Sequence, residues 1–100
     1  MPYRIVYERD TEEHLKALTA RQRSTVIDAI DKQLADQPAT PTRNRKPMRE
    51  NPLASWELRV GNLRVYYDVA AKGSEPTVNI LAIGIKRRER VSIGGQEYKL

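Results

Sequence analysis

The stretch WELRVGNLRVYYDV, residues 56–69, predicts a tight β-hairpin. Apolar and polar side chains alternate on both sides of Gly61-Asn62, as in two strands that a two-residue turn connects. Glycine at the first turn position favours a type II′ turn, because the twist of that turn matches the twist of the strands. The predicted cross-strand pairs, counted outward from the turn, are Val60 with Leu63, Arg59 with Arg64, Leu58 with Val65, Glu57 with Tyr66 and Trp56 with Tyr67.

The two faces of this hairpin differ in character. One face is apolar and is predicted to face the core; it carries Trp56, Leu58, Val60, Leu63, Val65, Tyr67 and Val69. The other face carries Glu57, Arg59, Arg64 and Tyr66. Two arginines directly opposite each other destabilise a sheet. A bound phosphate would relieve this repulsion, so the polar face is a candidate binding surface.

Composition limits the class of protein. The 100 residues suit one domain with a single modest core, and 39% apolar with 31% charged residues is ordinary for a globular chain. There is no cysteine, and His14 is the single histidine, so neither a disulfide framework nor a metal site is expected. No run of about 20 apolar residues predicts a membrane span, and the N-terminus lacks the apolar centre of a signal peptide. A cytoplasmic location is the simplest expectation.

The excess of basic residues is uneven along the chain. Lysine and arginine number 18 against 13 acidic residues, for a net charge of +5. Residues 43–49 (RNRKPMR) hold four bases, and residues 86–90 (KRRER) hold four bases and one acid. Such clusters suit RNA or DNA as a partner, although a single cluster is as readily a solvated surface.

Two helices are expected near the N-terminus, after a strand over residues 3–8. Asp10 or Thr11 is suited to cap a short helix, TEEHLKAL, on whose polar surface His14 is expected. Thr19 and Gln22 have the spacing of a capping box for a second helix, which Pro38 and Pro41 end. This helix has an apolar stripe and a supporting ion pair, formed by Val26, Ile27, Ile30 and Leu34, and by Asp28 with Lys32.

The remaining elements predict a sheet. A polar, proline-bearing segment over residues 38–54 precedes the hairpin, and a turn over residues 70–76 follows it. Residues 77–84 (TVNILAIG) are apolar enough for a central strand that is buried on both faces. Residues 91–100 form a tail, capable of mobility, with weak strand character around Gly94-Gly95. The predicted fold is α+β: a mostly antiparallel four-stranded sheet with the two N-terminal helices packed on one face.

The hairpin text, the strand ILAIG and its basic continuation IKRRER resemble the RelE/ParE superfamily of toxins from bacterial type II toxin–antitoxin systems. The resemblance runs from Tyr3 to about Arg90 and includes the order of elements. It implies a single RelE-like domain over residues 1–100 and points to the RelE-type branch, whose members cleave mRNA on the ribosome. A cognate antitoxin protein in a hetero-oligomer, the ribosome and mRNA are then the implied partners, and no cofactor is implied.

Metal-free RNA cleavage requires a base for the 2′-hydroxyl proton, cations for the charge on the phosphate and an acid for the leaving 5′-oxygen. Arginine suits the second role because its planar fork binds two phosphate oxygens, and aromatic rings can stack an unpaired base. By resemblance, Arg64 occupies the position of the hairpin arginine of RelE-type toxins, and Lys86 or Arg87 the basic position after the last strand. The candidate catalytic residues are Arg64, Arg59, Lys86, Arg87, Tyr66 and Glu57, and the candidate RNA-binding residues are Arg45, Lys46, Arg49, Arg88 and Arg90.

The chain also departs from the RelE pattern. Ser55 and Glu57 stand where RelE itself has lysines, and residues 91–93 replace an expected tyrosine or histidine. Tyr98 is the only later aromatic candidate, so the identity of the acid and the base is open. Glu57 is either the general base or a salt-bridge partner of Arg59 or Arg64.

Two other functions remain open. A ParE-like toxin would share the fold and inhibit DNA gyrase through protein–protein contact, without needing clustered phosphate ligands. A catalytically weak RNA-binding relative is the second alternative, although the low aromatic content of 6% is unusual for an RNA-binding module.

Overall fold

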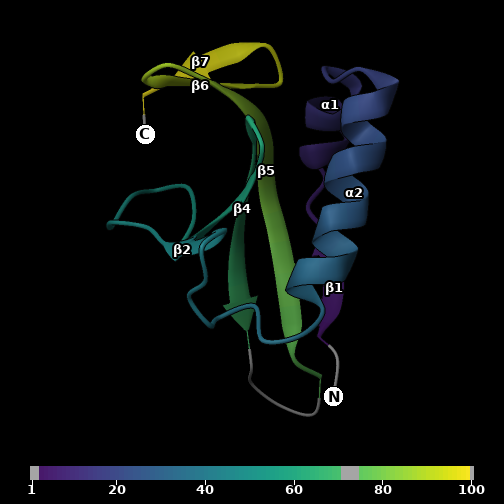
Figure 1. The fold of residues 1–100 in the computed structure, drawn as a ribbon, viewed down its shortest axis with the longest axis vertical. Coiled ribbons are helices and arrows are strands. Elements are labelled where there is room, and N and C mark those ends of the chain that lie inside the picture. The colour runs from purple at the N-terminus through teal and green to yellow at the C-terminus, as the bar shows by residue number, and fades with distance from the viewer. Residues whose placement is uncertain (1–2, 71–74, 100) are drawn as a thin grey trace.

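Two helices pack against one face of a strongly curved sheet, as Figure 1 shows. The computed structural model describes residues 3–70 and 75–99, so residues 71–74 of the expected turn lie outside the described residues. In chain order, the elements are β1 (Arg4–Tyr7), α1 (Thr11–Lys16), α2 (Ala20–Leu34), β2 (Arg45–Pro47), β3 (Trp56–Val60), β4 (Leu63–Ala70), β5 (Thr77–Arg87), β6 (Arg90–Ile93) and β7 (Gln96–Tyr98). The predicted α+β class with two N-terminal helices on one face is confirmed.

The sheet is larger than the four strands expected. Within the described residues, seven strands are connected in the order β2-β3-β4-β5-β6-β7, and β1 pairs with β5. Only the pairing of β1 with β5 is parallel. The additional strands are β2, β6 and β7, which have three, four and three residues. Segments this short give no periodic signal, and β2 contains Pro47, which an edge strand tolerates.

The hairpin has the predicted register. All five expected pairs between β3 and β4 are present, from Val60 with Leu63 to Trp56 with Tyr67. Gly61 has a φ of +59°, which glycine adopts without strain, and Asn62 does not have a positive φ. This combination fits the predicted type II′ turn. The rings of Trp56 and Tyr67 stack with their centroids 6.1 Å apart.

The main core lies between the helices and the sheet. All seven apolar hairpin residues belong to it or pack against it, and α2 contributes Val26, Ile30 and Leu34. Burial raises the pKa of Tyr67 to about 12, and its hydroxyl donates a hydrogen bond to the Pro38 carbonyl at 2.7 Å. This bond ties the chain after α2 to the sheet. β5 is the central strand, as expected, and it extends to Arg87.

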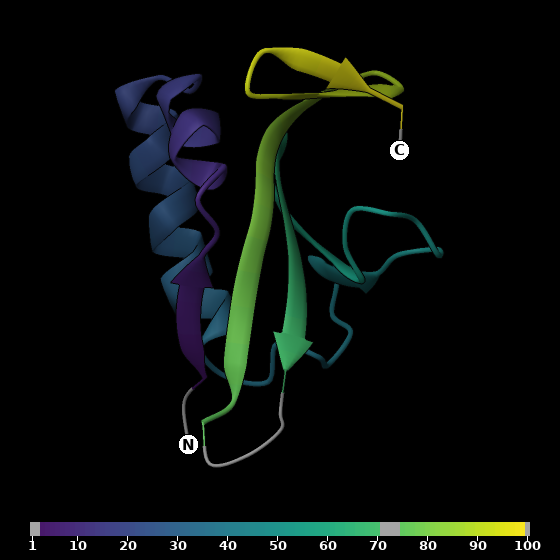
Figure 2. The same ribbon diagram turned by 180° about the vertical axis from the view of Figure 1, so that it is seen from behind.

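A second, smaller core covers part of the opposite face. It consists of Ala54, Tyr66, Ala82, Val91 and Ile93, with Met48, Leu53 and Leu81 packed against it. The hairpin of β6 and β7 and the loop between β2 and β3 supply most of these side chains. Figure 2 shows both segments on the side of the sheet away from the helices. The weak strand character predicted around Gly94-Gly95 corresponds to the antiparallel pairing of β6 with β7. The mobility of this tail stays a prediction.

The helices follow the sequence with three corrections. The capping box of Thr19 and Gln22 is present, and Asp28 pairs with Lys32 at 3.0 Å. However, α1 ends at Lys16, and Asp10 lies at its N-cap without a side-chain cap hydrogen bond. Thr11 is buried, and its hydroxyl donates to the Glu8 carbonyl at 2.6 Å. Ile27 is 37% exposed because only the narrow stripe of residues 26, 30 and 34 faces the sheet. No helix of the described ranges is both long and apolar enough to cross a membrane.

His14 is not the surface residue that the sequence predicted. It is half-buried, and its Nδ1 accepts a hydrogen bond from the Ile83 backbone N–H at 3.3 Å. In the pairing of β4 with β5, Leu81 has no partner residue. The pairing of β1 with β5 ends at Ile80, and the pairing of β6 with β5 begins at Gly84. His14 therefore provides a hydrogen-bond acceptor for the part of β5 that neither β1 nor β6 pairs with. Burial lowers the pKa of His14, an effect that the nearby Asp10 carboxylate partly offsets.

Candidate nucleic-acid interface

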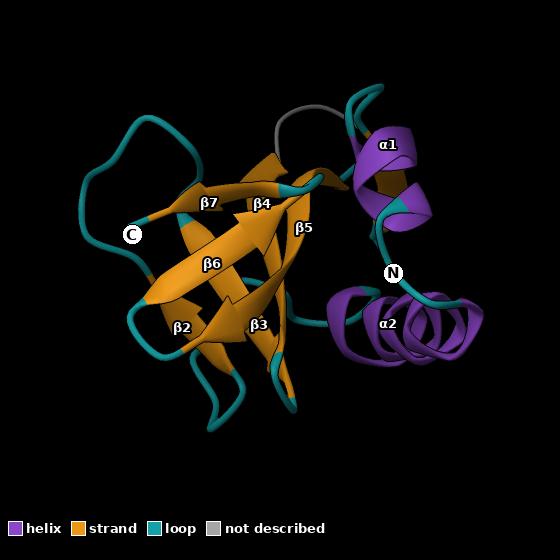
Figure 3. Ribbon diagram, turned by 90° about the horizontal axis from the view of Figure 1, so that it is seen from above, coloured by secondary structure: helices purple, strands orange, loops and turns teal. Residues whose placement is uncertain are grey.

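A cleft of about 640 Å³ lies on the sheet face away from the helices. Residues of the four neighbouring strands β2, β3, β4 and β5 line it, together with the loop that follows β2. Two further lining residues, Val91 and Lys99, belong to the C-terminal hairpin, which consists of β6, β7 and the residue that follows β7. Figure 3 shows the helices on one side of the sheet and these segments on the other. The lining residues are Lys46, Pro47, Met48, Arg49, Glu50, Asn51, Pro52, Glu57, Arg59, Tyr66, Lys86, Val91 and Lys99.

The cleft is strongly basic. Of its lining residues, five are cationic and two are acidic, which gives a net of three positive charges. The cations are Lys46, Arg49, Arg59, Lys86 and Lys99, and the acids are Glu50 and Glu57. Charges of one sign in a concave site concentrate counter-ions. A polyanion is therefore the class of ligand that this cleft suits.

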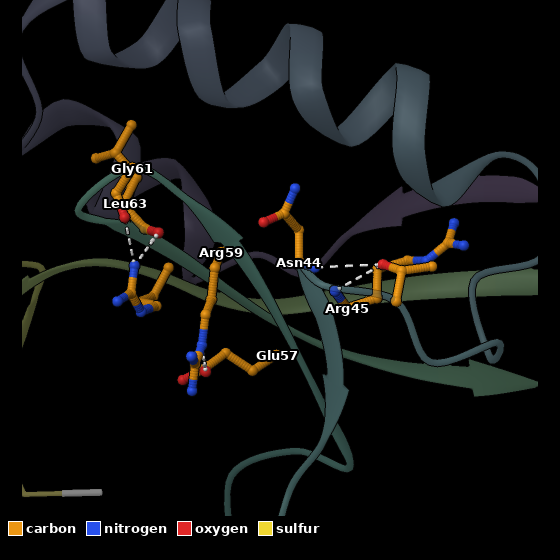
Figure 4. A network of polar contacts seen from close by, with 8 residues as sticks. Asn44, Arg45, Glu57, Arg59, Gly61 and Leu63 are labelled. Atoms are coloured by element: carbon orange, nitrogen blue, oxygen red, sulfur yellow. Dashed lines mark hydrogen bonds and ion pairs between the residues drawn. The ribbon is translucent and has the colours of Figure 1, made fainter.

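Glu57 and Arg59 form an ion pair within the cleft. The Arg59 Nε lies 2.8 Å from the Glu57 Oε1, as Figure 4 shows. The Glu57 side chain is 15% exposed and the Arg59 side chain 47%. The salt bridge that the sequence offered as one role of Glu57 is thus present. The outer part of the Arg59 guanidinium is left accessible for an anion.

Tyr66 lies beneath this pair, opposite Glu57 on β4. It is fully buried, and its hydroxyl makes no hydrogen bond within the described residues. Burial, and then the negative charge of Glu57, raises the pKa of Tyr66. The phenol therefore stays protonated near neutral pH and can donate but not act as a base. Its ring is covered, so it offers no face for stacking a base while this packing holds.

Arg64 lies opposite Arg59, as predicted, but its guanidinium does not line the cleft. Its Nη1 donates to the carbonyls of Gly61 and Leu63, at 2.8 and 2.9 Å (Figure 4). Each of the facing arginines thus has its own acceptors inside the fold. The predicted repulsion is relieved without an external phosphate.

Arg45 is placed differently from the neighbouring bases of its cluster. Because side chains alternate along β2, Lys46 lies in the cleft with Arg49, whereas Arg45 points to the helix side. The Arg45 Nη1 donates to the carbonyls of Gln33 and Asp36, at 2.6 and 3.2 Å. These hydrogen bonds tie β2 to the end of α2. A contact of Arg45 with RNA stays a prediction.

The second basic cluster forms a hairpin. Lys86 pairs with Val91 and Arg87 with Arg90, and Arg88 adopts a φ of +58° in the turn between them. Lys86 lines the cleft, whereas Arg87, Arg88, Glu89 and Arg90 surround a separate shallow hollow at the tip. Of the two residues proposed for the basic position after the last strand, Lys86 is the one in the cleft.

Several cleft residues were missed from the sequence. Asn51 shapes the loop: its amide nitrogen donates to the Arg49 and Ala54 carbonyls, and its Oδ1 accepts from the backbone N–H groups of Leu53 and Ala54. The Asn51-Pro52 pair is a turn signal that could have indicated an ordered loop. Lys99 carried no signal, because its position depends on the C-terminal hairpin.

Comparison with known proteins agrees with this fold. Over residues 5–90, the sequence matches the family described as ParE toxin of the type II toxin–antitoxin system, parDE. The chain belongs to this family. It is therefore a toxin of the RelE/ParE superfamily, as the resemblance of the hairpin and the last strand implied. No curated protein matches its sequence.

Two solved structures share the fold. The toxin–antitoxin complex RelBE2 from Mycobacterium tuberculosis contains a chain with a TM-score of 0.72 and 23% identity, and the match covers 86% of this chain and 100% of that one. The YoeB/ParE toxin from Agrobacterium tumefaciens has a TM-score of 0.64 and 17% identity, with 84% of this chain and 99% of that chain covered. At these identities the likeness shows the fold alone, and it confirms the predicted RelE-like architecture.

Proposed function

We propose that this toxin is a metal-independent, ribosome-associated mRNA endoribonuclease that blocks translation. The observation that carries the proposal is the basic cleft, with five cations around a half-buried carboxylate. A protein that acts only through protein–protein contact has no need for phosphate ligands in a concave site. RNA cleavage needs both features, because a carboxylate can accept a proton while cations hold the phosphate.

In the proposed reaction, the 2′-oxygen forms a bond to phosphorus as the bond to the 5′-oxygen breaks. Glu57 accepts the proton of the 2′-hydroxyl, and Arg59 and Lys86 neutralise the charge that develops on the phosphate. The Lys86 ammonium is the cleft group that donates a proton to the leaving 5′-oxygen. Arg64 joins as a further phosphate ligand when its guanidinium leaves the turn carbonyls.

The remaining basic residues are assigned to the RNA backbone. Lys46 and Arg49 extend the cleft along the loop after β2. Arg87, Arg88 and Arg90 form the exposed tip between β5 and β6, where they suit phosphates of ribosomal RNA. Together these contacts would hold the toxin on a large polyanion.

The proposed protein partner is a cognate antitoxin in a hetero-oligomer. The similar RelBE2 chain is part of a toxin–antitoxin complex. For a basic toxin, an acidic segment that becomes ordered on binding would give electrostatic complementarity. Covering the cleft or displacing the C-terminal hairpin would each block the proposed site.

A gyrase inhibitor is the second candidate. The family match itself favours it, since the family is described as ParE toxin. The structure adds two observations in its favour: Arg64 is hydrogen-bonded to its own turn, and the Tyr66 ring is buried. In this alternative the cleft would serve the antitoxin or the target protein rather than RNA.

Induction of the toxin without an antitoxin separates the two functions. The proposed ribonuclease halts protein synthesis first and leaves mRNA cut within codons. The gyrase inhibitor produces DNA breaks while translation initially continues. Pulse labelling of new protein and DNA-break assays in the same culture measure both. Intact mRNA together with early DNA breaks contradicts the proposal, and normal growth with abundant folded protein contradicts both functions.

A further inference from the structure

The match to the toxin family ends at residue 90, and most of the C-terminal hairpin lies beyond it. We infer that this hairpin forms a wall of the cleft that takes part in RNA binding, and that Lys99 binds a backbone phosphate of single-stranded RNA there. The inference rests on the proposed function, because it names a further ligand for the same substrate. Neither the basic clusters of the sequence nor the family match points to Lys99.

Gly84 allows the hairpin to approach the sheet closely. It pairs with Ile93, in the pair of β5 and β6 that lies farthest from their connecting turn. A Cβ atom at Gly84 would lie 2.6 Å from the Ser92 carbonyl oxygen and 2.8 Å from side-chain atoms of Ile93 and Val91. These distances are shorter than van der Waals contact. The absence of a side chain at this position is therefore what permits β6 to fold over the sheet.

Apolar contacts hold the hairpin in this position. Val91 and Ile93 are 1% and 6% exposed, and both belong to the second core with Tyr66 and Ala82. Val91 and Tyr66 belong to this core and also line the cleft. Buried side chains of β6 thus fix the hairpin as a defined wall on this side of the cleft.

Lys99 follows β7 immediately and lines the cleft. Lys46 and Lys86 reach the same cleft from β2 and β5, so the cations approach it from different elements. Lysine acts as a compact charge and needs no fixed fork to bind a phosphate. The chemistry that this arrangement recognises is the phosphate backbone of a single strand, which is the substrate of the proposed reaction.

The salt dependence of binding measures this contact. Each phosphate that a cation neutralises on a single strand adds about 0.7 to the slope of log affinity against log salt concentration. The test uses the full chain and a single-stranded 2′-O-methyl RNA oligonucleotide, which lacks the nucleophilic hydroxyl and cannot be cleaved. We expect Lys99→Ala to lower the magnitude of the slope by about 0.7 and to weaken binding uniformly across sequences.

Lys32→Ala is the matched control, because it removes the same charge from α2, where Lys32 pairs with Asp28 outside the cleft lining. This control is expected to keep the parental slope. A Lys99→Ala slope equal to the parental slope, with the parent binding normally, overturns the inference and leaves the proposed function standing. A parent without salt-dependent binding to the oligonucleotide also overturns the inference, whereas the proposed function is overturned only by uncut mRNA after toxin induction.

Discussion

Arg59 and Arg64 show how two facing arginines are accommodated in a hairpin. Arg59 pairs with Glu57, and Arg64 donates to two carbonyls of its own turn. The sequence predicted their adjacency because alternation and the turn fix the register. It did not predict their separate partners, because side-chain hydrogen bonds depend on local rotamers. Of these two arginines, only Arg59 lines the cleft and can contact a ligand there without rearrangement.

Arg64→Ala separates the turn role of this residue from its proposed phosphate role. Loss of one exposed and one partly buried hydrogen bond is expected to cost about 0.5–1.5 kcal/mol of unfolding free energy, measured by thermal or urea unfolding. We expect toxicity to fall less than in Arg59→Ala. A variant with parental stability and no toxicity would instead make Arg64 a primary phosphate ligand. A variant that is destabilised but fully toxic would leave Arg64 with the turn role alone.

His14 makes the stability of the fold depend on pH. Its neutral Nδ1 accepts from Ile83, and burial lowers its pKa below the ordinary value of 6.5. The unfolded chain therefore binds the proton more readily than the folded chain, so stability falls as the pH drops. The contribution is complete above pH 6.5 and is lost as the pH falls through the lower folded pKa.

The measurement is a series of urea unfolding curves from about pH 7.5 down to about pH 5, where histidine titrates. The parent is expected to lose more stability than His14→Gln over this range, because glutamine keeps an acceptor but does not titrate. The Asp10 carboxylate near His14 opposes the effect and limits its size. Equal losses in the two proteins would remove His14 as the cause.

At the scale of single elements, the capping box starts α2. Thr19 accepts from the Gln22 backbone N–H at 3.1 Å, and the Gln22 side chain accepts from the Thr19 backbone N–H at 2.9 Å. We expect Thr19→Ala to lower the unfolding free energy by about 1 kcal/mol. Ser24→Ala, at an exposed position inside the same helix, is the control and is expected to be neutral or slightly stabilising. Thermal unfolding of both variants measures the difference.

The C-terminal hairpin depends on Gly84. Because a Cβ atom there meets backbone as well as side chains, we expect Gly84→Ala to push β6 away from β5. Amide hydrogen exchange over residues 91–98 should then rise towards that of an open segment, while α2 stays protected. Gly95→Ala is the control within the hairpin, because open space surrounds this turn residue and only its positive φ is strained. Unchanged protection in Gly84→Ala would show that β5 adjusts instead.

The elements that the sequence predicted well are those with strong local signals. The alternation of apolar and polar residues around Gly61-Asn62 was enough to predict the β3–β4 hairpin. The spacing of Thr19 and Gln22 was enough to predict the start of α2. The missed features depend on contacts between distant segments. His14 meets Ile83 where neither β1 nor β6 pairs with β5, and Lys99 reaches the cleft because the C-terminal hairpin packs over Gly84. The sequence thus indicated a basic polar face, but not the walls that make this face a cleft.

At the scale of the whole molecule, the larger core lies on one face of the sheet and the proposed RNA cleft on the other. The helices lie on one side of the sheet, and the loop after β2 and the C-terminal hairpin lie on the other (Figure 1). The larger core is on the helix side, and the loop and the hairpin contribute lining residues to the basic cleft on the other side. Arg45 links the two faces, since it ties β2 to the end of α2 while its neighbour Lys46 lies in the cleft. We therefore expect substitutions of the charged cleft residues to change the proposed activity without unfolding the chain.

The central claim is that the cleft around Arg59 cleaves mRNA, and primer extension on cellular mRNA after toxin induction tests it most directly. We predict cuts within codons for the parent and a cleavage rate lower by about 10²–10³ for Arg59→Ala, the usual cost of losing one preorganised donor to a developing oxyanion. Arg9→Ala, an exposed arginine outside the cleft lining, should cleave like the parent. Parental cleavage by folded Arg59→Ala, or a parent that arrests growth with uncut mRNA, would contradict the account.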